Sequence, residues 1–167
     1  MKRRNEIGII ATWFGELPNY FSAWLKSAEA NKSIDFIVIS DCDVESESSN
    51  IITIKSTLQN EVRKYEEKLK RRIKIDNAYK FCDCRLFFGL LYEDMLSEYD
   101  FWGYCDIDLV FGDIRSFVTD TVLEKYDRIY TYGHLCLYRN NTLMKNVYKM
   151  PGMIYSLDEI FLGEAKT

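Results

Sequence analysis

The stretch Phe101-Trp-Gly-Tyr-Cys-Asp-Ile-Asp108 decides the fold. Its first part, residues 101–105, is an uninterrupted apolar run, which predicts a strand buried on both faces of a sheet. Side chains alternate along a strand, so two carboxylates separated by one residue lie on the same side. In open α/β sheets, ligands bind at the carboxyl ends of the strands. The stretch therefore predicts a buried strand that carries Asp106 and Asp108 into a binding site.

Apolar runs and helical patterns alternate on both sides of this stretch. Strands are expected at residues 7–12, 34–39, 51–54, 100–105, 128–132 and 135–138. Helices are expected at residues 17–30, 56–72, 79–99 and 140–148. Ser56 and Gln59 are read as a capping box for the second helix, and Asp113 as a cap for the helix after the acidic stretch. The alternation predicts one α/β domain over residues 1–167, with a mostly parallel sheet flanked by helices.

The composition restricts the classes of function. A formal net charge of -4 excludes a general nucleic-acid binder, because such a protein needs a basic face to displace counterions from phosphates. The 12 Tyr, 10 Phe and 3 Trp suit a protein that handles carbohydrate or nucleotide. The apolar run at residues 7–11 is too short for a signal sequence or a membrane span. We therefore expect a cytoplasmic protein without a transmembrane segment.

The cysteines favour reduced thiols over disulfides. Their number, five, is odd, and Cys82, Cys84 and Cys105 lie in segments that are expected to be buried. Cys82 and Cys84 lack both the two-residue gap and the second cysteine pair of a structural zinc site. We therefore do not expect these thiols to bind zinc.

The two aspartates favour a divalent cation. A hard ion such as Mg²⁺ or Mn²⁺ binds a few protein oxygens and completes its coordination with water and substrate phosphates. The apolar run before Asp106 places the carboxylates at the edge of a core, where unpaired charge is costly. The alternative is a solvated turn that follows a strand. Lys80, Asp83 and Arg85 lie at the start of the helix expected at 79–99, whose N-terminus is suited to phosphate.

Four stretches together resemble a family of bacterial glycosyltransferases associated with surface-polysaccharide synthesis. They are Thr12-Trp13-Phe14, Tyr79-Lys-Phe-Cys-Asp83, Tyr99-Asp-Phe-Trp-Gly-Tyr-Cys-Asp-Ile-Asp108 and Gly133-His-Leu-Cys-Leu-Tyr-Arg-Asn140. The resemblance runs from about residue 6 to the end of the chain. The sequence is also distantly similar to mannosyltransferase and galactosyltransferase groups that carry an Asp-x-Asp signature. The resemblance implies a GT-A-like fold, which is a Rossmann-like arrangement.

The resemblance also implies roles for particular residues. Asp108 would ligate Mn²⁺ or Mg²⁺, while Asp106 would contact the metal or the ribose of the donor. Residues implied to hold the nucleobase, the nucleoside or the donor sugar are Ala11, Thr12, Trp13, Asp41, Lys80, Asp83 and Arg85. The third metal ligand of such enzymes usually lies further along the chain.

Three further residues are candidates for catalysis. His134, the single histidine, lies where similar enzymes approach the donor sugar or the acceptor. A lone histidine is more often structural, and this alternative stays open. Asp158 and Glu159 resemble the acidic pair that contacts the donor sugar or serves as catalytic base in related folds. The alternative for this pair is the start of a helix.

These features lead to one main hypothesis, the metal-dependent transfer of a sugar from a nucleotide-diphosphate donor. A UDP-sugar is the expected donor and a glycan the expected acceptor. The chain stops at Thr167, earlier than expected, so an acceptor-binding C-terminal region is expected to be missing. One alternative is therefore a non-catalytic nucleotide-sugar-binding or assembly module. A nucleotidyltransferase or phosphohydrolase is less favoured, because the chain has no P-loop and no histidine cluster. Exposed aromatics and an uncovered sheet edge would favour a homo-oligomer.

Overall fold

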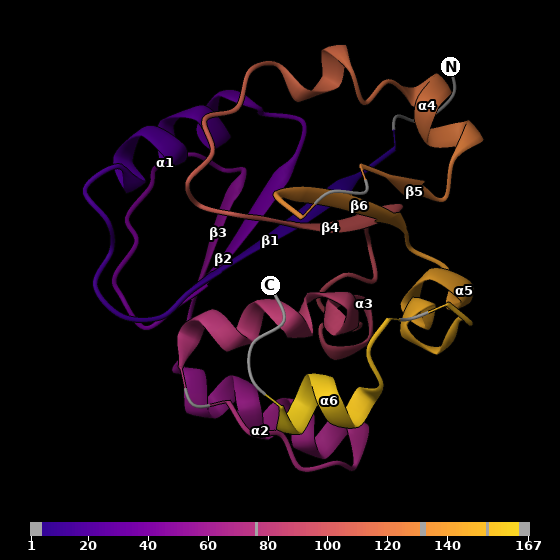
Figure 1. The fold of residues 1–167 in the computed structure, drawn as a ribbon. Coiled ribbons are helices and arrows are strands. Elements are labelled where there is room, and N and C mark those ends of the chain that lie inside the picture. The colour runs from indigo at the N-terminus through magenta and orange to yellow at the C-terminus, as the bar shows by residue number, and fades with distance from the viewer. Residues whose placement is uncertain (1–4, 76, 131–132, 153, 164–167) are drawn as a thin grey trace.

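A six-stranded sheet organises the computed structural model, which describes residues 5–75, 77–130, 133–152 and 154–163 (Figure 1). The strands are β1 (Ile7–Trp13), β2 (Asp35–Ser40), β3 (Ile51–Lys55), β4 (Phe101–Cys105), β5 (Arg128–Ile129) and β6 (Leu135–Arg139). The α-helices are α1 (Phe21–Ala30), α2 (Leu58–Leu69), α3 (Phe88–Leu91), α4 (Asp120–Lys125), α5 (Thr142–Lys145) and α6 (Leu157–Leu162). The 3₁₀ helices are η1 (Ala78–Phe87), η2 (Ile114–Ser116) and η3 (Val147–Lys149).

The sheet order is β3-β2-β1-β4-β6-β5. β1 pairs in parallel with both β2 and β4, and β2 pairs in parallel with β3. β6 runs antiparallel to β4 and β5. The strand order therefore reverses between β1 and β4, and the crevice beyond such a reversal is where open α/β sheets bind ligands. The predicted α/β fold with a mostly parallel sheet is confirmed, and β6 adds an antiparallel end.

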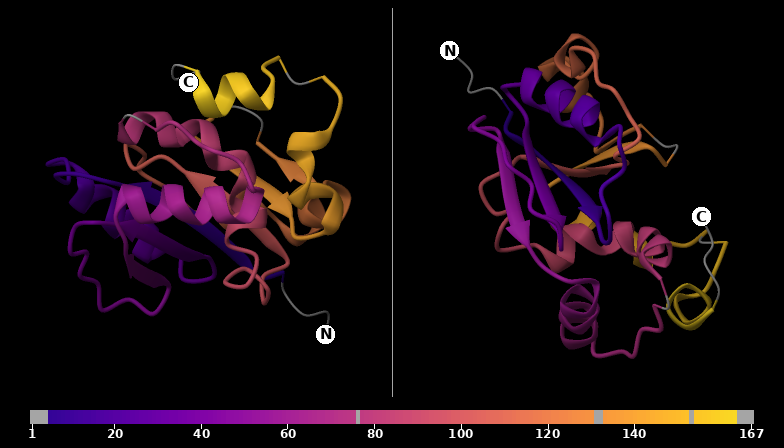
Figure 2. Two further views of the ribbon diagram at one scale, coloured as in Figure 1. Left: turned by 90° about the horizontal axis from the view of Figure 1, so that it is seen from below. Right: turned by 90° about the vertical axis from the view of Figure 1, so that its left-hand side faces the viewer.

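Both faces of the sheet are covered, as the continuous apolar runs predicted. Ile9 and Ala11 pack in one core with Trp24 of α1, whereas Ile10 packs in the other core with Tyr65 of α2 and Phe81 of η1. Figures 1 and 2 show α1 on one side of the sheet and α2, α3 and α6 on the other. Among the described residues, no helix has both the length and the apolar character needed to cross a bilayer.

The prediction of one long helix over residues 79–99 is wrong. The segment instead forms η1, a single turn of α-helix in α3, and a series of turns. Phe81, Cys84 and Phe87 are all buried, and their spacing of three matches a 3₁₀ helix, in which side chains at i and i+3 eclipse. Close packing then limits α3, because a Cβ on Gly89 would lie 2.4 Å from the Trp102 ring. Contacts with the sheet therefore override the helical pattern.

The predicted start of the second helix is also wrong. Thr57 caps α2 by accepting a hydrogen bond from the backbone N–H of Asn60 at 3.2 Å. Ser56 does not form the predicted capping box with Gln59, because its hydroxyl donates to the buried Glu61 carboxylate. The Ser56 hydroxyl thus forms a polar contact in the core, whereas the sequence pattern predicted that it caps the helix.

The remaining elements differ from the predictions at their ends. The helix expected at 140–148 is divided into α5 and η3, and its N-cap is Asn141. β5 is shorter than the strand expected at 128–132, of which residues 131 and 132 lie outside the described ranges. Asp113 does cap the next element, as predicted, by accepting from the backbone N–H of Arg115 at 3.0 Å.

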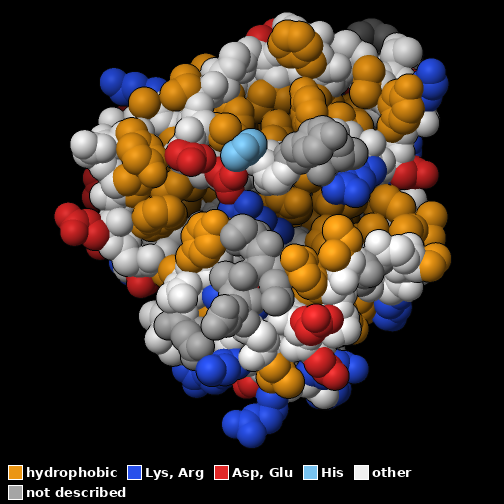
Figure 3. Space-filling view, viewed as in Figure 1, with side chains coloured by type: hydrophobic (Ala, Val, Ile, Leu, Met, Phe, Trp, Pro, Cys, Tyr) orange, Lys and Arg blue, Asp and Glu red, His pale blue; other side chains and the backbone are white. Residues whose placement is uncertain are grey.

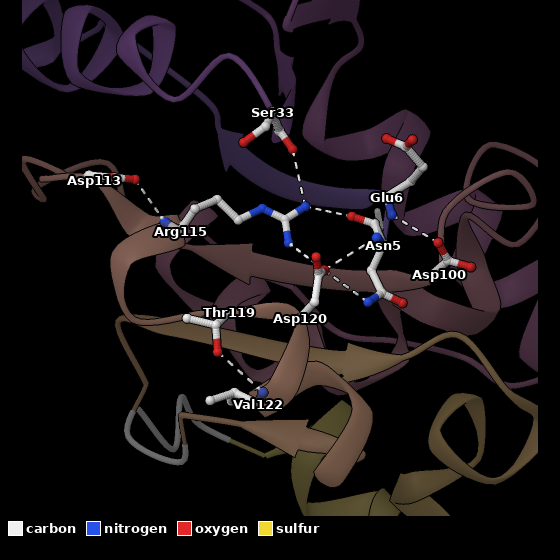
Figure 4. A network of polar contacts seen from close by, with 9 residues as sticks. All are labelled: Asn5, Glu6, Ser33, Asp100, Asp113, Arg115, Thr119, Asp120 and Val122. Carbon is white, nitrogen blue, oxygen red and sulfur yellow. Dashed lines mark hydrogen bonds and ion pairs between the residues drawn. The ribbon is translucent and has the colours of Figure 1, made fainter. Parts of the chain in front are cut away.

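An arginine clamp holds the amino ends of the parallel strands. Arg115 donates to the backbone oxygen of Asn5 at 2.5 Å and to that of Ser33 at 3.4 Å, and it pairs with Asp120 at 3.7 Å (Figure 4). Asn5 precedes β1, and Ser33 precedes β2. This network therefore lies at the opposite ends of the strands from Asp106 and Asp108, and it leaves the carboxyl ends of the sheet for a ligand.

A substitution of Gly103 tests how closely β4 packs against β6. A Cβ at this position would lie 2.4 Å from the backbone oxygen of Cys136 on β6. We expect Gly103→Ala to lower the free energy of unfolding by about 2 kcal/mol, because overpacking forces a backbone shift. Urea denaturation measures this change, with Gly112→Ala as the control, since nothing lies within 4 Å of a Cβ there. Equal unfolding midpoints for the two variants would contradict the packing argument.

Candidate functional site

Strand β4 places Asp106 and Asp108 at its carboxyl end. All five strand residues are buried, and Ile107 between the aspartates is 4% exposed, so it fills the core while the carboxylates lie outside it. The backbone N–H of Asp106 donates to the backbone oxygen of His134 at 2.9 Å, which extends the β4–β6 pairing by one step. This bond brings the single histidine of the chain beside the acidic pair.

The three side chains form a compact group of possible metal ligands. One ligand atom each from Asp106, Asp108 and His134 lies within 4.8 Å of the other two. Figure 3 shows the histidine beside acidic and basic side chains at a hollow in the surface. His134 remains 74% exposed and Asp106 only 23%, so the group faces solvent from the rim of the core.

Asp106 is held from two sides. Its Oδ2 lies 3.0 Å from Nδ1 of His134, and its Oδ1 forms an ion pair with the guanidinium of Arg85. Its backbone oxygen also accepts from the indole N–H of Trp24 at 3.1 Å. The Arg85 guanidinium lies over the Tyr104 ring, 5.3 Å from the ring centroid. The orientation of the Asp106 carboxylate is therefore determined by Arg85 on η1 and by His134, the residue before β6.

The electrostatic surroundings keep Arg85 charged. Burial alone would lower its pKa, but the anionic forms of Cys82 and Asp106, a hydrogen bond to Asp106 and the nearby Tyr104 outweigh burial and raise the pKa. Burial raises the pKa of the Cys82 thiol, Asp106 and Asp83 add to the rise, and Arg85 opposes it. Arg85 is thus a fixed positive charge, and Cys82 a neutral thiol, at physiological pH.

A cleft of about 460 Å³ opens beside these residues. Its lining residues are Thr12, Trp13, Phe14, Tyr20, Ala78, Tyr79, Cys82, Arg85, Asp106, Ile107, Asp108 and His134. The volume falls within the range usual for small-molecule sites. Its aromatic lining residues, which we call the aromatic wall, are Trp13, Phe14, Tyr20 and Tyr79 from the end of β1, the start of α1 and η1. Ionisable groups complete the lining. The cleft therefore combines stacking surfaces with a charged end, which suits a nucleotide.

The donor set fits a divalent metal ion. Two carboxylates and one imidazole, open toward a cleft, leave coordination positions for water or phosphate oxygens. The 3.0 Å between Asp106 Oδ2 and His134 Nδ1 is also short enough for both atoms to bind one ion. Imidazole is a better ligand for Mn²⁺ than for Mg²⁺, because Mg²⁺ prefers oxygen. The identity of the ion, Mn²⁺ or Mg²⁺, stays a prediction from the sequence.

A protein-family model matches residues 9–165, which is nearly the whole chain. The chain belongs to the family of unknown function DUF6625. This family description assigns no activity, so the glycosyl transfer implied by the sequence resemblance stays a prediction. No curated protein matches the DUF6625 chain in sequence.

Among solved structures, the DUF6625 chain is similar to the apo-form glycosyltransferase GlyE of Streptococcus pneumoniae TIGR4. The TM-score is 0.42 and the sequence identity is 12%, over 88% of this chain and 36% of that chain. The DUF6625 chain thus spans little more than a third of the length of GlyE. A likeness of this extent is distant and assigns no activity to the cleft.

The cleft brings together six of the residues named from the sequence. They are Thr12, Trp13, Arg85, Asp106, Asp108 and His134. Thr12 and Trp13 end β1, and Arg85 reaches the acidic pair from η1. His134 was expected near the donor or acceptor, and its place among the possible metal ligands was not predicted. The β4–β6 pairing that produces this neighbour relation joins residues 28 positions apart.

Two predicted nucleotide contacts do not line the cleft. Ala11 is fully buried in the core of the sheet. Asp41 accepts a hydrogen bond from the backbone N–H of Gly15 at 2.8 Å, and the Cys42 thiol donates to the Gly15 oxygen at 2.9 Å. Gly15 has a φ of 98°, in the left-handed region that favours glycine. Asp41 therefore shapes the loop after β1, which begins with the cleft residue Phe14.

Lys80 and Asp83 also lie outside the cleft. Their side chains are 4% and 3% exposed and form an ion pair at 2.9 Å. The Lys80 ammonium additionally donates to the backbone oxygen of Ile160 in α6 at 2.5 Å. This buried pair connects η1 to α6, so the structure favours a bracing role over the predicted contacts with base or sugar.

Asp158 and Glu159 lie on α6 and do not line the cleft. Asp158 forms an exposed ion pair with Arg71 at 2.6 Å. The Glu159 carboxylate accepts from the backbone N–H of Ser156 at 2.8 Å and from its hydroxyl at 2.7 Å, which completes a capping box. The alternative of a helix start describes Glu159 well, although the N-cap itself is Ser156. A catalytic role for this pair remains untested.

The sequence interpretation missed several lining residues. Phe14 and Tyr20 contribute to the aromatic wall, and Tyr79 and Cys82 precede Arg85 along η1. Tyr79, Cys82 and Arg85 are spaced by three, so they share one face of the 3₁₀ helix. The sequence therefore carries a period of three in this segment, but its apolar residues also fit the α-helical period of 3.6, which was the one predicted.

Cys82 reports on the electrostatics of the DUF6625 cleft. Because its pKa is raised, little of the thiol is ionised near neutrality, and the thiolate is the reactive form. We expect iodoacetamide to modify Cys82 more slowly than N-acetylcysteine at pH 7.5, and faster as the pH rises toward 10. Peptide mass spectrometry follows Cys82 separately from the other four free cysteines. Modification as fast as that of N-acetylcysteine at pH 7.5 would show that the thiol is not desolvated.

Proposed function

We propose that this protein binds a nucleotide-diphosphate sugar together with a divalent metal ion, and that it acts in transfer of the sugar to an acceptor. One observation carries the proposal: Asp106, Asp108 and His134 converge at the carboxyl end of β4, beside a cleft with an aromatic wall. Carboxylates open to a cleft bind an ion that also binds phosphate, which fits a diphosphate ligand better than a neutral one.

The charged end of the cleft is suited to the diphosphate. Asp106, Asp108 and His134 would hold the ion, which when bound neutralises negative charge that develops on the departing diphosphate. Arg85 lines the same end and stays positively charged, so it can bind phosphate oxygens that the ion does not cover. Both features lower the free energy of a leaving group that gains negative charge.

The aromatic wall is suited to the base or the sugar. Trp13, Tyr20 and Tyr79 line the cleft from three different segments, and Tyr20 and Tyr79 are 46% and 61% exposed. Exposed aromatic rings stack on nucleobases and on the apolar faces of sugars. The Thr12 hydroxyl adds a hydrogen-bonding group at the end of β1. This arrangement supports a nucleoside at the aromatic end and the diphosphate at the charged end.

The proposed reaction is a group transfer. The bond between the anomeric carbon and the diphosphate oxygen breaks, and the acceptor hydroxyl oxygen forms the new bond as its proton leaves. UDP is the first nucleotide to test, a glycan is the acceptor class, and surface-polysaccharide synthesis is the setting. These three details are supported by the sequence resemblance alone.

A second candidate is a nucleotide-sugar-binding module without turnover. Among the described residues that line the cleft, Asp106 and Asp108 are the sole carboxylates, and both belong to the proposed metal group. His134 is the remaining side chain there of a type that serves as a general base. If His134 binds the ion, the described part of the cleft has no general base apart from the metal ligands. This favours ligand binding over catalysis.

Asp108→Asn tests the ligand site. We expect wild-type protein to bind UDP or GDP only when Mn²⁺ is present, and the variant to bind at least about a hundredfold more weakly. Loss of groups that merely orient a metal ligand already costs 10–100-fold in affinity, so loss of a ligand should cost no less. Isothermal titration calorimetry, with and without Mn²⁺, measures the change.

Asp127→Asn is the matched control. It also removes one carboxylate charge, but its exposed ion pair with Arg139 lies outside the cleft lining. We expect unchanged nucleotide affinity in this variant. Equal losses in both variants, or binding of nucleotide without any metal, would contradict the proposed site. Release of UDP from a UDP-sugar by the wild type would favour the enzyme, and tight binding without release the module.

A further inference from the structure

The charge balance around Asp106 differs from that of an open acidic pair. The Arg85 guanidinium is ion-paired with Oδ1 of Asp106, so it cancels one of the two negative charges that would attract a cation. Oδ2 faces the opposite way, toward His134, at 3.0 Å. An ion held by Oδ2, Asp108 and His134 would therefore bind with a permanent positive charge on the other side of the shared carboxylate.

Arg85 is held in this position. Its side chain is 14% exposed, and its guanidinium lies over the Tyr104 ring. It extends from η1, whose opposite face packs Phe81, Cys84 and Phe87 into the core. Because the group is largely buried, solvent and salt screen its charge less than they screen an exposed arginine. The same guanidinium lines the cleft, so it also faces any anionic ligand.

We infer that Arg85 couples the metal to the diphosphate: it opposes binding of a divalent ion alone and favours an ion that arrives with an anionic ligand. This inference rests on the proposed function. A cation entering by itself meets repulsion from Arg85, whereas a diphosphate brings negative charge that both the ion and Arg85 attract. Metal and diphosphate then bind cooperatively, and the protein without diphosphate binds the free ion weakly.

The inference predicts opposite effects of one substitution. Arg85→Met removes the charge and keeps an apolar stem of similar reach against Tyr104. We expect affinity for Mn²⁺ alone to rise at least about tenfold, because Coulomb's law gives this factor for removing a unit charge about 6 Å from a divalent ion even at the dielectric constant of water. Affinity for pyrophosphate or UDP in the presence of Mn²⁺ should fall by about tenfold. A merely structural role would weaken both.

Two variants serve as controls. Arg85→Lys keeps the positive charge and should leave the affinity for Mn²⁺ alone within about twofold of the wild type. Arg71→Met breaks another Arg–Asp pair, at 2.6 Å, outside the cleft lining and should change neither affinity. Thermal unfolding shows whether each variant is folded. If Arg85→Met does not fold, Arg85→Gln removes the same charge with a polar side chain.

Electron paramagnetic resonance of free Mn²⁺ measures metal binding without any need for activity, and calorimetry measures pyrophosphate and UDP. In the wild type, pyrophosphate should tighten Mn²⁺ binding by about tenfold or more, judged against titrations without protein, because pyrophosphate also chelates Mn²⁺ in solution. Equal Mn²⁺ affinity with and without pyrophosphate would overturn the inference, as would an Arg85→Met variant with unchanged or weaker Mn²⁺ binding. Pyrophosphate carries no base or sugar. Coupling to pyrophosphate without binding of UDP or GDP would therefore refute the proposed function and leave this inference standing.

Discussion

The backbone hydrogen bond from Asp106 to His134 is the interaction on which the candidate site depends. It continues the antiparallel pairing of β4 and β6 by one step beyond Cys105 and Leu135. The bond places the histidine beside the acidic pair, where its Nδ1 lies 3.0 Å from Oδ2 of Asp106, while Arg85 contacts the same carboxylate at Oδ1. The antiparallel strand is thus the feature that turns the end of a parallel sheet into a group of three possible ligands.

The 3₁₀ helix η1 contributes to the core and to the cleft at once. Its period of three gives it one face with Phe81 and Phe87 in the core, and a second with Cys82 and Arg85 at the cleft. An α-helix would rotate such residues progressively out of register. Lys80 pairs with Asp83 and donates to α6, so these two residues, predicted from the sequence as ligand contacts, connect η1 to α6.

Apolar runs were sufficient to predict the strands and the position of the acidic pair, because strands buried on both faces leave little choice of conformation. The segment at 79–99 was not predictable in this way, since its pattern fits two helical periods and contacts with the sheet select between them. The position of His134 depends on a pairing between strands distant in sequence, and that of Arg85 on a side-chain ion pair. Neither the strand pairing nor the ion pair leaves a pattern in the local sequence, although His134 and Arg85 were both named as candidates.

The loop after β1 has a consequence for the thermodynamics of recognition. Asp41 and Cys42 hold Gly15 through two hydrogen bonds, and the Trp13 indole donates to the Glu16 oxygen at 2.9 Å. Trp13 and the loop that follows it are therefore held in place before a ligand arrives, and their conformational entropy is lost during folding. A ligand that stacks there meets a preorganised surface, so its association should carry a smaller entropic penalty than closure of a mobile loop would impose.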